Sequence, residues 1–165
     1  MAAVGVNEEG FREVLAVEIA AGEKSTAYSS LLRGLQDRGL SRVHLVVSDD
    51  HEGIKAAVAG ELPGVEWQRC VVHFMRNVLS YLSYVPSTAM EEVAEDLKAI
   101  FKVRREKTAK ALVEEFASVY EKGYPKAVSV LEAGIGEALT YLRYPRALTT
   151  PGYARRTFWS VCSRR

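Results

Sequence analysis

The chain has 165 residues, which is enough for one domain with a substantial hydrophobic core. Its hydrophobic share of 48% and its charged share of 26% are ordinary for a soluble globular protein. The formal net charge of +1 excludes a polycation that binds phosphate through its overall charge.

The first residues of the chain and its two cysteines indicate the cellular compartment of the protein. Residues 1–9 lack a basic segment followed by a long apolar one, so they do not form a secretion signal. No stretch is long and apolar enough to span a bilayer. Cys70 and Cys162 are too few for a disulfide framework and fit a reducing compartment. We therefore expect a cytoplasmic protein without a membrane segment.

The chain opens with two predicted strands, residues 2–6 and 11–20, separated by a turn. They are expected to pair as an antiparallel hairpin. Strand alternation places Val14, Ala16 and Glu18 on one face.

A helix is predicted next. Ser25 or Thr26 can cap its start with a hydroxyl group, and Gly39 followed by Leu40 is a typical stop. Its apolar face at positions i, i+3, i+4 and i+7 consists of Tyr28, Leu31, Leu32 and Leu35.

Further elements alternate between strand and helix. Residues 43–47 form a short apolar run that predicts a strand buried on both faces. A helix follows to about Ala59, with Gly60 as its stop, and residues 65–69 form another short strand. Cys70 then begins a helix. Its expected core side chains are Phe74, Met75, Val78, Leu79 and Leu82.

Residues 87–144 contain helical patterns only. Thr88 and Glu91 have the spacing of a capping box, and Tyr144-Pro145 ends the last helix. The apolar stripes are more typical of a packed core than of a cofactor site. The three stripes are Met90, Ala94, Leu97 and Phe101; Ala109, Leu112, Phe116 and Tyr120; and Val128, Leu131, Ile135, Leu139 and Leu142.

Asp49 is the best candidate for a catalytic residue. It follows the predicted strand 43–47, at the end where open α/β sheets bind ligands, and its carboxylate could hold Mg²⁺. The neighbouring Asp50 has a simpler interpretation as the N-cap of the next helix. His51 could be a metal ligand, although an exposed position near the cap is the favoured interpretation.

Cys70-x-x-His73 has the spacing of one edge of a zinc site. Zinc needs about four ligands, however, and nothing ties His44 or His51 to this pair. A buried thiol and a hydrogen-bonded histidine are therefore favoured over a metal site.

Residues 38–82 resemble the middle of Mutator-type bacterial insertion-sequence transposases. The family patterns are "RGL-x-x-V-x-L-V-x-SD-x-H-x-G-[IL]" and then "WQRC-x-x-H-[FL]-x-RN", and the resemblance extends over about residues 2–146. The matching residues are Ser48, Asp49, His51, Gly53, Trp67, Gln68, Arg69, Cys70, His73, Phe74, Arg76 and Asn77.

This resemblance implies an α/β chain with a ribonuclease-H-like catalytic core and an all-helical insertion. In such DDE transposases an acidic triad holds two Mg²⁺ or Mn²⁺ ions, which activate water and then a DNA 3′-hydroxyl for attack on phosphodiesters at the element's ends. Asp49 matches the second acid and would be the metal ligand. Cys70 and His73 match a motif close to the active site. The expected parts are a partial core (1–85), the insertion (86–145) and a tail unlike the family (146–165).

Two of the three acids have no counterpart here. The first would lie upstream of Val4, and no Asp or Glu follows Glu137. Read one base out of phase, residues 152–162 can give Leu-Arg-Thr-Thr-Asn-Val-Leu-Glu-Arg-Leu, which resembles the family segment "RTTN-x-[IL]-ER-[LF]" with the third acid. We therefore expect a truncated, frameshifted fragment that is catalytically inactive and binds Mg²⁺ or Mn²⁺ poorly, because one carboxylate cannot position two metal ions.

The strand that would carry the first acid belongs between the 2–20 hairpin and strand 43–47. Without it, both flanking strands would expose unpaired backbone groups, so the two halves could close directly, pair with another chain as a homo- or hetero-oligomer, or stay loose. Two other functions stay open. The helical half of the chain could bind intact transposase and inhibit it without catalysis, or the chain could be a metal-dependent nuclease using Asp49, Asp50 and Glu52.

Overall fold

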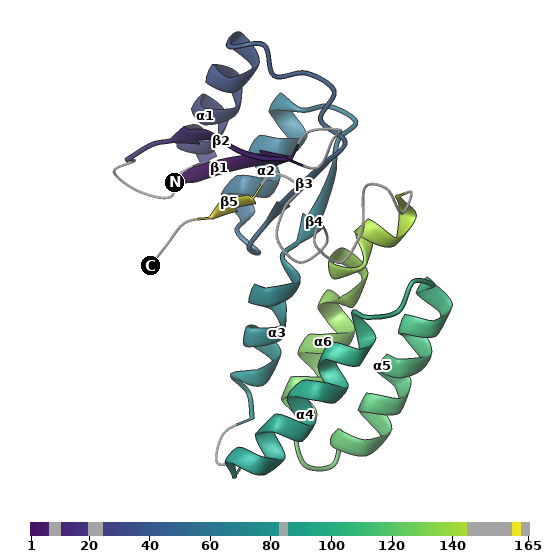
Figure 1. The fold of residues 1–165 in the computed structure, drawn as a ribbon. Helices are drawn as coiled ribbons and strands as arrows, with labels where there is room; N and C mark the ends of the chain where they lie inside the picture. Colours follow the sequence, from purple (N-terminus) through teal and green to yellow (C-terminus); the bar gives the residue numbers. More distant parts are fainter. Residues whose placement is uncertain (7–10, 20–24, 83–85, 145–159, 163–165) are drawn as a thin grey trace. The chain divides into compact units, whose positions relative to one another are not determined.

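The computed structural model describes residues 1–6, 11–19, 25–82, 86–144 and 160–162 (Figure 1). The chain divides into two compact units. The first comprises Met1–Cys70 with Arg143–Arg165 and contains the sheet, and the second comprises Val71–Leu142 and is helical. The architecture confirms the α/β class. The boundaries expected at residues 85 and 145, which concern the parts of the family architecture, stay predictions.

The first unit contains a five-stranded mixed sheet with the order β2-β1-β5-β3-β4. β1 is antiparallel to β2 and to β5, whereas β3 is parallel to β5 and to β4. The strands are β1 (Ala2–Val6), β2 (Arg12–Val17), β3 (Leu45–Ser48), β4 (Glu66–Arg69) and β5 (Ser160–Cys162).

A β-bulge interrupts the pairing of β1 with β2. Ala3 pairs with Ala16 and Val4 with Val14, so Leu15 is the extra residue on β2. Arg38 donates a hydrogen bond to the Leu15 carbonyl oxygen. The antiparallel pairing was predicted correctly, but the placement of Val14 and Ala16 on one face was wrong, because one extra residue inverts the alternation. Val14 is 68% exposed, while Ala16 packs against the core.

β5 lies at the centre of the sheet, between β1 and β3 (Figure 1). The sequence had predicted that a strand would be missing at this position. Ala2, Ala3 and Val4 pair with β5 on one side, and Val47 and Ser48 pair with it on the other. None of the three expected outcomes for the flanking strands included this arrangement. Pairing patterns within single segments could not reveal it, because β5 comes from the far end of the sequence.

Helices α1 (Ser25–Asp37) and α2 (Glu52–Glu61) pack with the sheet around one apolar cluster. The stop at Gly39 is confirmed: its φ is +96°, and the Leu40 N–H donates to the Leu35 carbonyl at 3.0 Å. The stop at Gly60 was wrong, because α2 continues through it to Glu61. The buried cluster comprises Ala3, Tyr28, Leu31, Leu32, Leu35, Val46, Ile54, Ala57, Val58 and Leu62.

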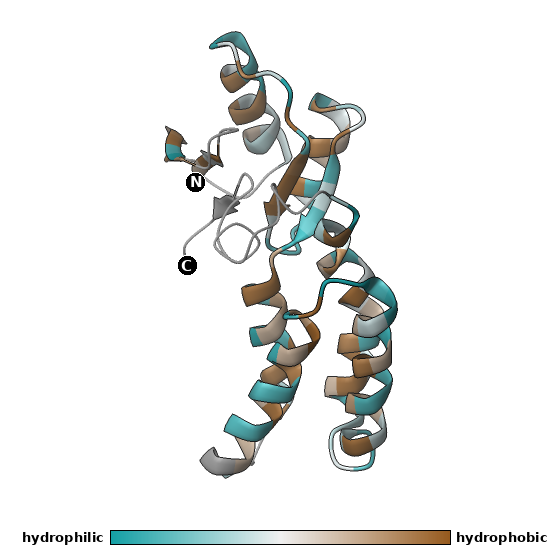
Figure 2. Cartoon of the chain, turned by 45° about the vertical axis from the view of Figure 1, so that its right-hand side comes forward, coloured by the Kyte–Doolittle hydropathy of each residue, from teal (hydrophilic) through white to brown (hydrophobic). Residues whose placement is uncertain are grey.

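The second unit is a set of antiparallel helices. α3 packs against α4 and α6, and α5 packs against α4 and α6. Figure 2 shows apolar residues gathered on one side of the long helices and hydrophilic residues on the other. The elements are α3 (Val71–Leu79), α4 (Ser87–Ile100), α5 (Glu106–Tyr120), α6 (Pro125–Ala138) and the 3₁₀ helix η1 (Thr140–Arg143).

Two details of the helical prediction were wrong. α4 begins one residue before Thr88, with Pro86 at its N-cap and no side-chain cap. Thr88 is therefore the second residue of the helix and not its N-cap, so its spacing to Glu91 does not make a capping box. The buried stripe of α4 contains Leu97 as predicted, but Val93 and Ile100 complete it in place of Met90 and Ala94.

Arg143 and Tyr144 make polar contacts within the first unit. The Arg143 guanidinium lies 2.7 Å from Oε1 of Glu66 on β4, and the Tyr144 hydroxyl donates to the His44 carbonyl at 2.9 Å. Within the part of the chain that the structure describes, every helix is too short or too polar to cross a bilayer.

Candidate functional site

The candidate site lies at the carboxyl ends of two neighbouring strands. β3 and β4 are parallel and in register, with Ser48 beside Arg69. The Cys70 N–H donates to the Ser48 carbonyl at 2.6 Å, so the alignment persists past the last strand residues. Asp49 and Asp50 follow β3 directly. Sequence reasoning therefore placed Asp49 correctly at the strand end where open sheets bind ligands.

Ser48 and Trp67 fix the backbone that carries Asp49. The Ser48 hydroxyl accepts a hydrogen bond from Nε1 of Trp67 at 2.8 Å and donates one to the Asp49 carbonyl at 2.8 Å. Ser48 is buried, and Trp67 packs against the apolar cluster. Two residues of the sequence motif thus contact each other and determine where Asp49 leaves the sheet.

Asp49 is half-buried, and its Oδ1 atom is screened from solvent. A carboxylate oxygen removed from water needs compensating donors or positive charge. This position is compatible with a metal ligand and also with a carboxylate held by protein donors. Its catalytic role stays a prediction.

Asp50 is held by two cations. Lys55 Nζ lies 2.5 Å from one carboxylate oxygen, and Nη2 of Arg69 lies 2.9 Å from the other. Lys55 also lies 3.2 Å from Glu52 and 4.6 Å from the centre of the Trp67 ring. The prediction that Asp50 caps α2 was wrong, because its carboxylate is engaged with these cations and the next residue is the cap.

His51 is the N-cap of α2. Its Nδ1 accepts a hydrogen bond from the Gly53 N–H at 3.1 Å, and its ring lies 5.5 Å from the Tyr28 ring. A neutral ring with Nδ1 as acceptor carries its proton on Nε2. The cap position was expected, but the side chain is half-buried and not exposed. A Cβ at Gly53 would lie 3.0 Å from two His51 ring atoms, which explains the glycine in the motif.

The remaining motif residues show no metal-binding arrangement. Cys70 is a free, half-buried thiol in the first unit. His73 and Asn77 are half-buried on α3, and Arg76 is exposed. Nδ1 of His73 is buried and has no hydrogen-bond partner among the described residues, so the hydrogen bond expected of this histidine is not made at Nδ1.

The described residues do not fit a two-metal site. Such a site needs several acidic ligands on different elements. At the end of β3, the carboxylates of Asp50 and Glu52 are both paired with Lys55. In the described parts of the chain, no three His, Cys, Asp or Glu side chains form a group that could hold a metal ion. We assign no chemical step to a metal here.

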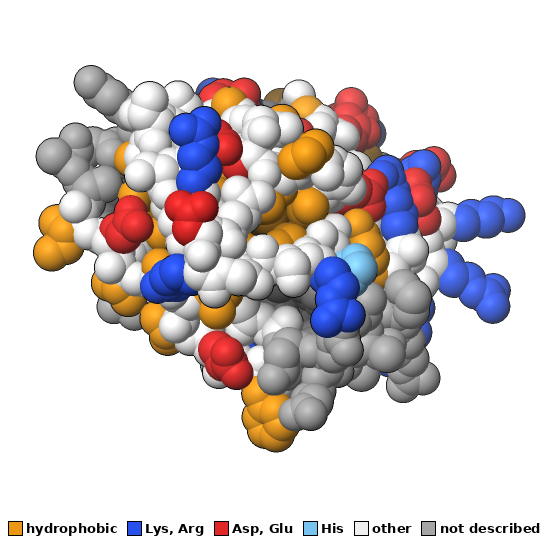
Figure 3. Space-filling view, turned by 90° about the horizontal axis from the view of Figure 1, so that it is seen from above, with side chains coloured by type: hydrophobic (Ala, Val, Ile, Leu, Met, Phe, Trp, Pro, Cys, Tyr) orange, Lys and Arg blue, Asp and Glu red, His pale blue; other side chains and the backbone are white. Residues whose placement is uncertain are grey.

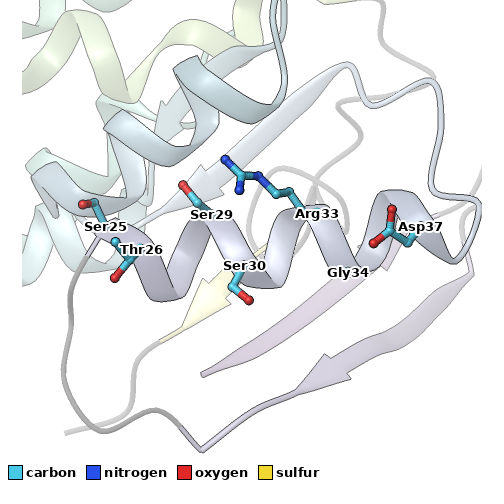
Figure 4. Close-up of a pocket in the computed structure, with 7 residues that line it drawn as sticks. All are labelled: Ser25, Thr26, Ser29, Ser30, Arg33, Gly34 and Asp37. Atoms are coloured by element: carbon cyan, nitrogen blue, oxygen red, sulfur yellow. The ribbon is translucent and has the colours of Figure 1, made fainter.

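A shallow polar groove of about 410 Å³ runs along α1 (Figure 4). Arg33 lies within it, but its guanidinium makes two 2.7 Å hydrogen bonds to Glu61. This pairing lowers the pKa of Glu61. Sequence analysis missed the groove, although hydroxyl groups recurring on one helical face were a signal. Its lining residues are Ser25, Thr26, Ser29, Ser30, Arg33, Gly34 and Asp37.

The chain is similar to known insertion-sequence transposases. It is 38% identical over 144 residues to the transposase for insertion sequence element ISRM5 of Rhizobium meliloti, which covers 87% of this chain and 35% of that protein. It is 35% identical over 145 residues to the transposase for IS406 of Burkholderia multivorans, covering 88% and 37%. For the transposase of IS256 in transposon Tn4001 of Staphylococcus aureus, the identity is 31% over 141 residues, covering 84% and 35%.

These alignments cover most of this chain but only about a third of each relative's length. Residues 1–157 match the family described as "Transposase, Mutator family". The resemblance inferred from the motifs is thereby confirmed, and the chain belongs to the Mutator family of transposases.

Proposed function

We propose that this chain is the middle part of a DDE-type catalytic domain that acts on the ends of an insertion element. The observation that carries this proposal is the position of Asp49, directly after a strand within a mixed sheet and inside the family motif. The antiparallel hairpin followed by two parallel strands supports a ribonuclease-H-like core. A protein with this role works on DNA in the cytoplasm.

In the proposed arrangement the residues around Asp49 are positioning residues. Ser48 and Trp67 direct the backbone of Asp49, and the cations Lys55 and Arg69 pair with the carboxylate of the neighbouring Asp50. In the intact protein Asp49 would hold a divalent metal ion together with acids that this chain does not supply. The frameshift account of residues 146–165 belongs to this proposal, and most of those residues lie outside the described parts of the chain.

We further propose that this polypeptide alone does not cleave DNA. The support is the charge pairing of Asp50 and Glu52, which leaves Asp49 without an acidic partner at the end of β3. The same pairing disfavours the nuclease alternative that uses all three acids.

A plasmid-nicking assay with Mg²⁺ and with Mn²⁺ tests this proposal. We expect no metal-dependent nicking by the parent chain and no difference for Asp49→Ala or for the control Asp37→Ala. Nicking that Asp49→Ala abolishes and Asp37→Ala preserves would overturn it.

The alternative function is noncatalytic binding to intact transposase. The edge strand β2 and its flanks favour it, because Phe11, Val14, Val17 and Ile19 are all at least 64% exposed. Figure 3 shows apolar side chains among charged ones on one face of the surface. Co-expression with an intact relative separates the two functions, since only an inhibitor lowers the transposition frequency. Restoration of that frequency by Val14→Lys with Val17→Lys would place the contact at this edge.

A further inference from the structure

A short segment of the helical unit has a high density of positive charge, although the whole chain is nearly neutral. Residues 98–110 hold six of the 22 Lys and Arg residues and a single acid, Glu106. A cluster of this density is typical of nucleic-acid-binding patches. The six cations are Lys98, Lys102, Arg104, Arg105, Lys107 and Lys110.

The six cations lie on a backbone segment that is packed against the rest of the helical unit. The segment comprises the end of α4, the connection to α5 and the first turns of α5, and all six basic residues are exposed. Phe101 holds the connection: its carbonyl accepts a hydrogen bond from Tyr141 Oη at 3.2 Å, and its ring meets Phe74 edge-on at 6.4 Å. Ala109 is buried one turn into α5. The exposed cations therefore project from a backbone that is packed on its inner side.

Half of these cations are compensated and half are not. Lys98 and Lys102 lie 2.5 and 3.6 Å from Glu95, and Lys110 lies 2.8 Å from Glu106. The other three, Arg104, Arg105 and Lys107, form no ion pair among the described residues. We call these three residues the basic loop. Three cations without a described ion pair within four consecutive positions concentrate positive charge locally.

We propose that the basic loop binds the phosphate backbone of duplex DNA, independently of sequence. This inference rests on the proposed function, because that function supplies the DNA, but it concerns a site on the helical unit. Guanidinium groups match phosphate geometry with paired N–H donors, and the lysine adds a point charge. Contacts of this kind position a protein on DNA without reading its bases.

The surroundings of the basic loop favour DNA over two other anionic partners. A membrane-binding helix or loop inserts large apolar side chains beside its cations, and protein interfaces use aromatic or aliphatic anchors. Among the described residues, the exposed large apolar side chains are Phe11, Val14, Val17, Ile19, Val72 and Val119. None of them belongs to the segment 98–110. Cations without exposed large apolar side chains beside them suit a phosphate backbone, where binding is driven by counterion release.

The test is the salt dependence of binding to a fluorescent duplex of arbitrary sequence, measured by anisotropy between about 50 and 200 mM salt. Each neutralised phosphate contributes about 0.9 to the slope of log affinity against log salt. We expect the variant Arg104→Ala/Arg105→Ala/Lys107→Ala to lower that slope by about 2.7, which means that it loses about 40-fold less affinity over this salt range.

Two control variants make the result specific. Lys98→Ala/Lys110→Ala/Lys122→Ala removes the same charge from the same unit and should leave the slope near that of the parent. Arg104→Lys/Arg105→Lys keeps the charge and should retain most of the slope. Circular dichroism establishes that each variant is folded.

The inference is overturned if the parent does not bind the duplex, or if the loop variant and its charge-matched control behave alike. It is also overturned if the loop variant changes binding to anionic phospholipid vesicles and leaves DNA binding unchanged. Neither result bears on the assignment of Asp49, which the nicking assay tests separately.

Discussion

The end of β3 and the basic loop both have a high density of charge. They differ in whether those charges are paired with opposite charges of the described residues. Asp50 is paired with Lys55 of α2 and Arg69 of β4, so its charge links two elements of the protein. The cations of the basic loop have no ion-pair partner among the described residues, and their side chains are exposed. The difference shows that paired charges hold elements of the protein in place, whereas unpaired charges remain available to bind a ligand.

The largest expected effect concerns the support of the basic loop. Burial raises the pKa of Tyr141 to about 12, so the folded state favours its protonated hydroxyl. The resulting stabilisation is complete below the unfolded pKa of about 10 and is lost as the pH rises towards 12. We expect the free energy of unfolding to fall by about 2–3 kcal/mol across this window.

Urea titrations at several pH values measure this loss, and Tyr141→Phe is the matched control because it cannot ionise. If the parent and the variant lose the same stability above pH 10, the packed support of the loop is not as described.

The second prediction compares an arginine-to-alanine substitution at the end of β3 with one in the basic loop. Arg69→Ala should lower the free energy of unfolding by about 1–2 kcal/mol, because it leaves Asp50 with one cation at a half-exposed site. Arg104→Ala should change it by less than about 0.5 kcal/mol, as expected for an exposed side chain that forms no ion pair with a described residue. Chemical denaturation measures both. Equal effects would show that charge pairing does not distinguish the two regions.

The third and smallest effect concerns the support of Asp49. Trp67→Phe keeps most of the apolar contact but removes the donor to the Ser48 hydroxyl, which should cost about 1 kcal/mol. The backbone amide signals of Asp49 and Asp50 should shift in NMR spectra, while those of the α4–α5 segment should not. Unchanged signals at Asp49 would mean that Ser48 and Trp67 do not position it.

Local patterns predicted the elements whose cause is local. The Tyr28–Leu35 stripe and the stop at Gly39 followed from helical spacing and glycine conformation, and both were confirmed. The position of Asp49 followed from a strand ending in acidic residues. These features depend on residues only a few positions apart, so the sequence contains their full explanation.

Features that depend on distant partners could not be predicted in the same way. The bulge at Leu15 depends on register against β1, and the central place of β5 depends on a segment more than 100 residues from β3. The two cations around Asp50 come from α2 and β4, which only the fold brings together. The uncompensated state of Arg104, Arg105 and Lys107 likewise required knowledge of which cations find acids.

A calorimetric titration of the parent chain with Mn²⁺, repeated on Asp49→Ala, tests the central claim most directly. Asp49 without an acidic partner predicts no saturable binding of two ions and closely similar traces for the parent and the variant. Stoichiometric binding of two Mn²⁺ ions that Asp49→Ala abolishes would contradict the claim, because it would show that this chain assembles a complete metal site.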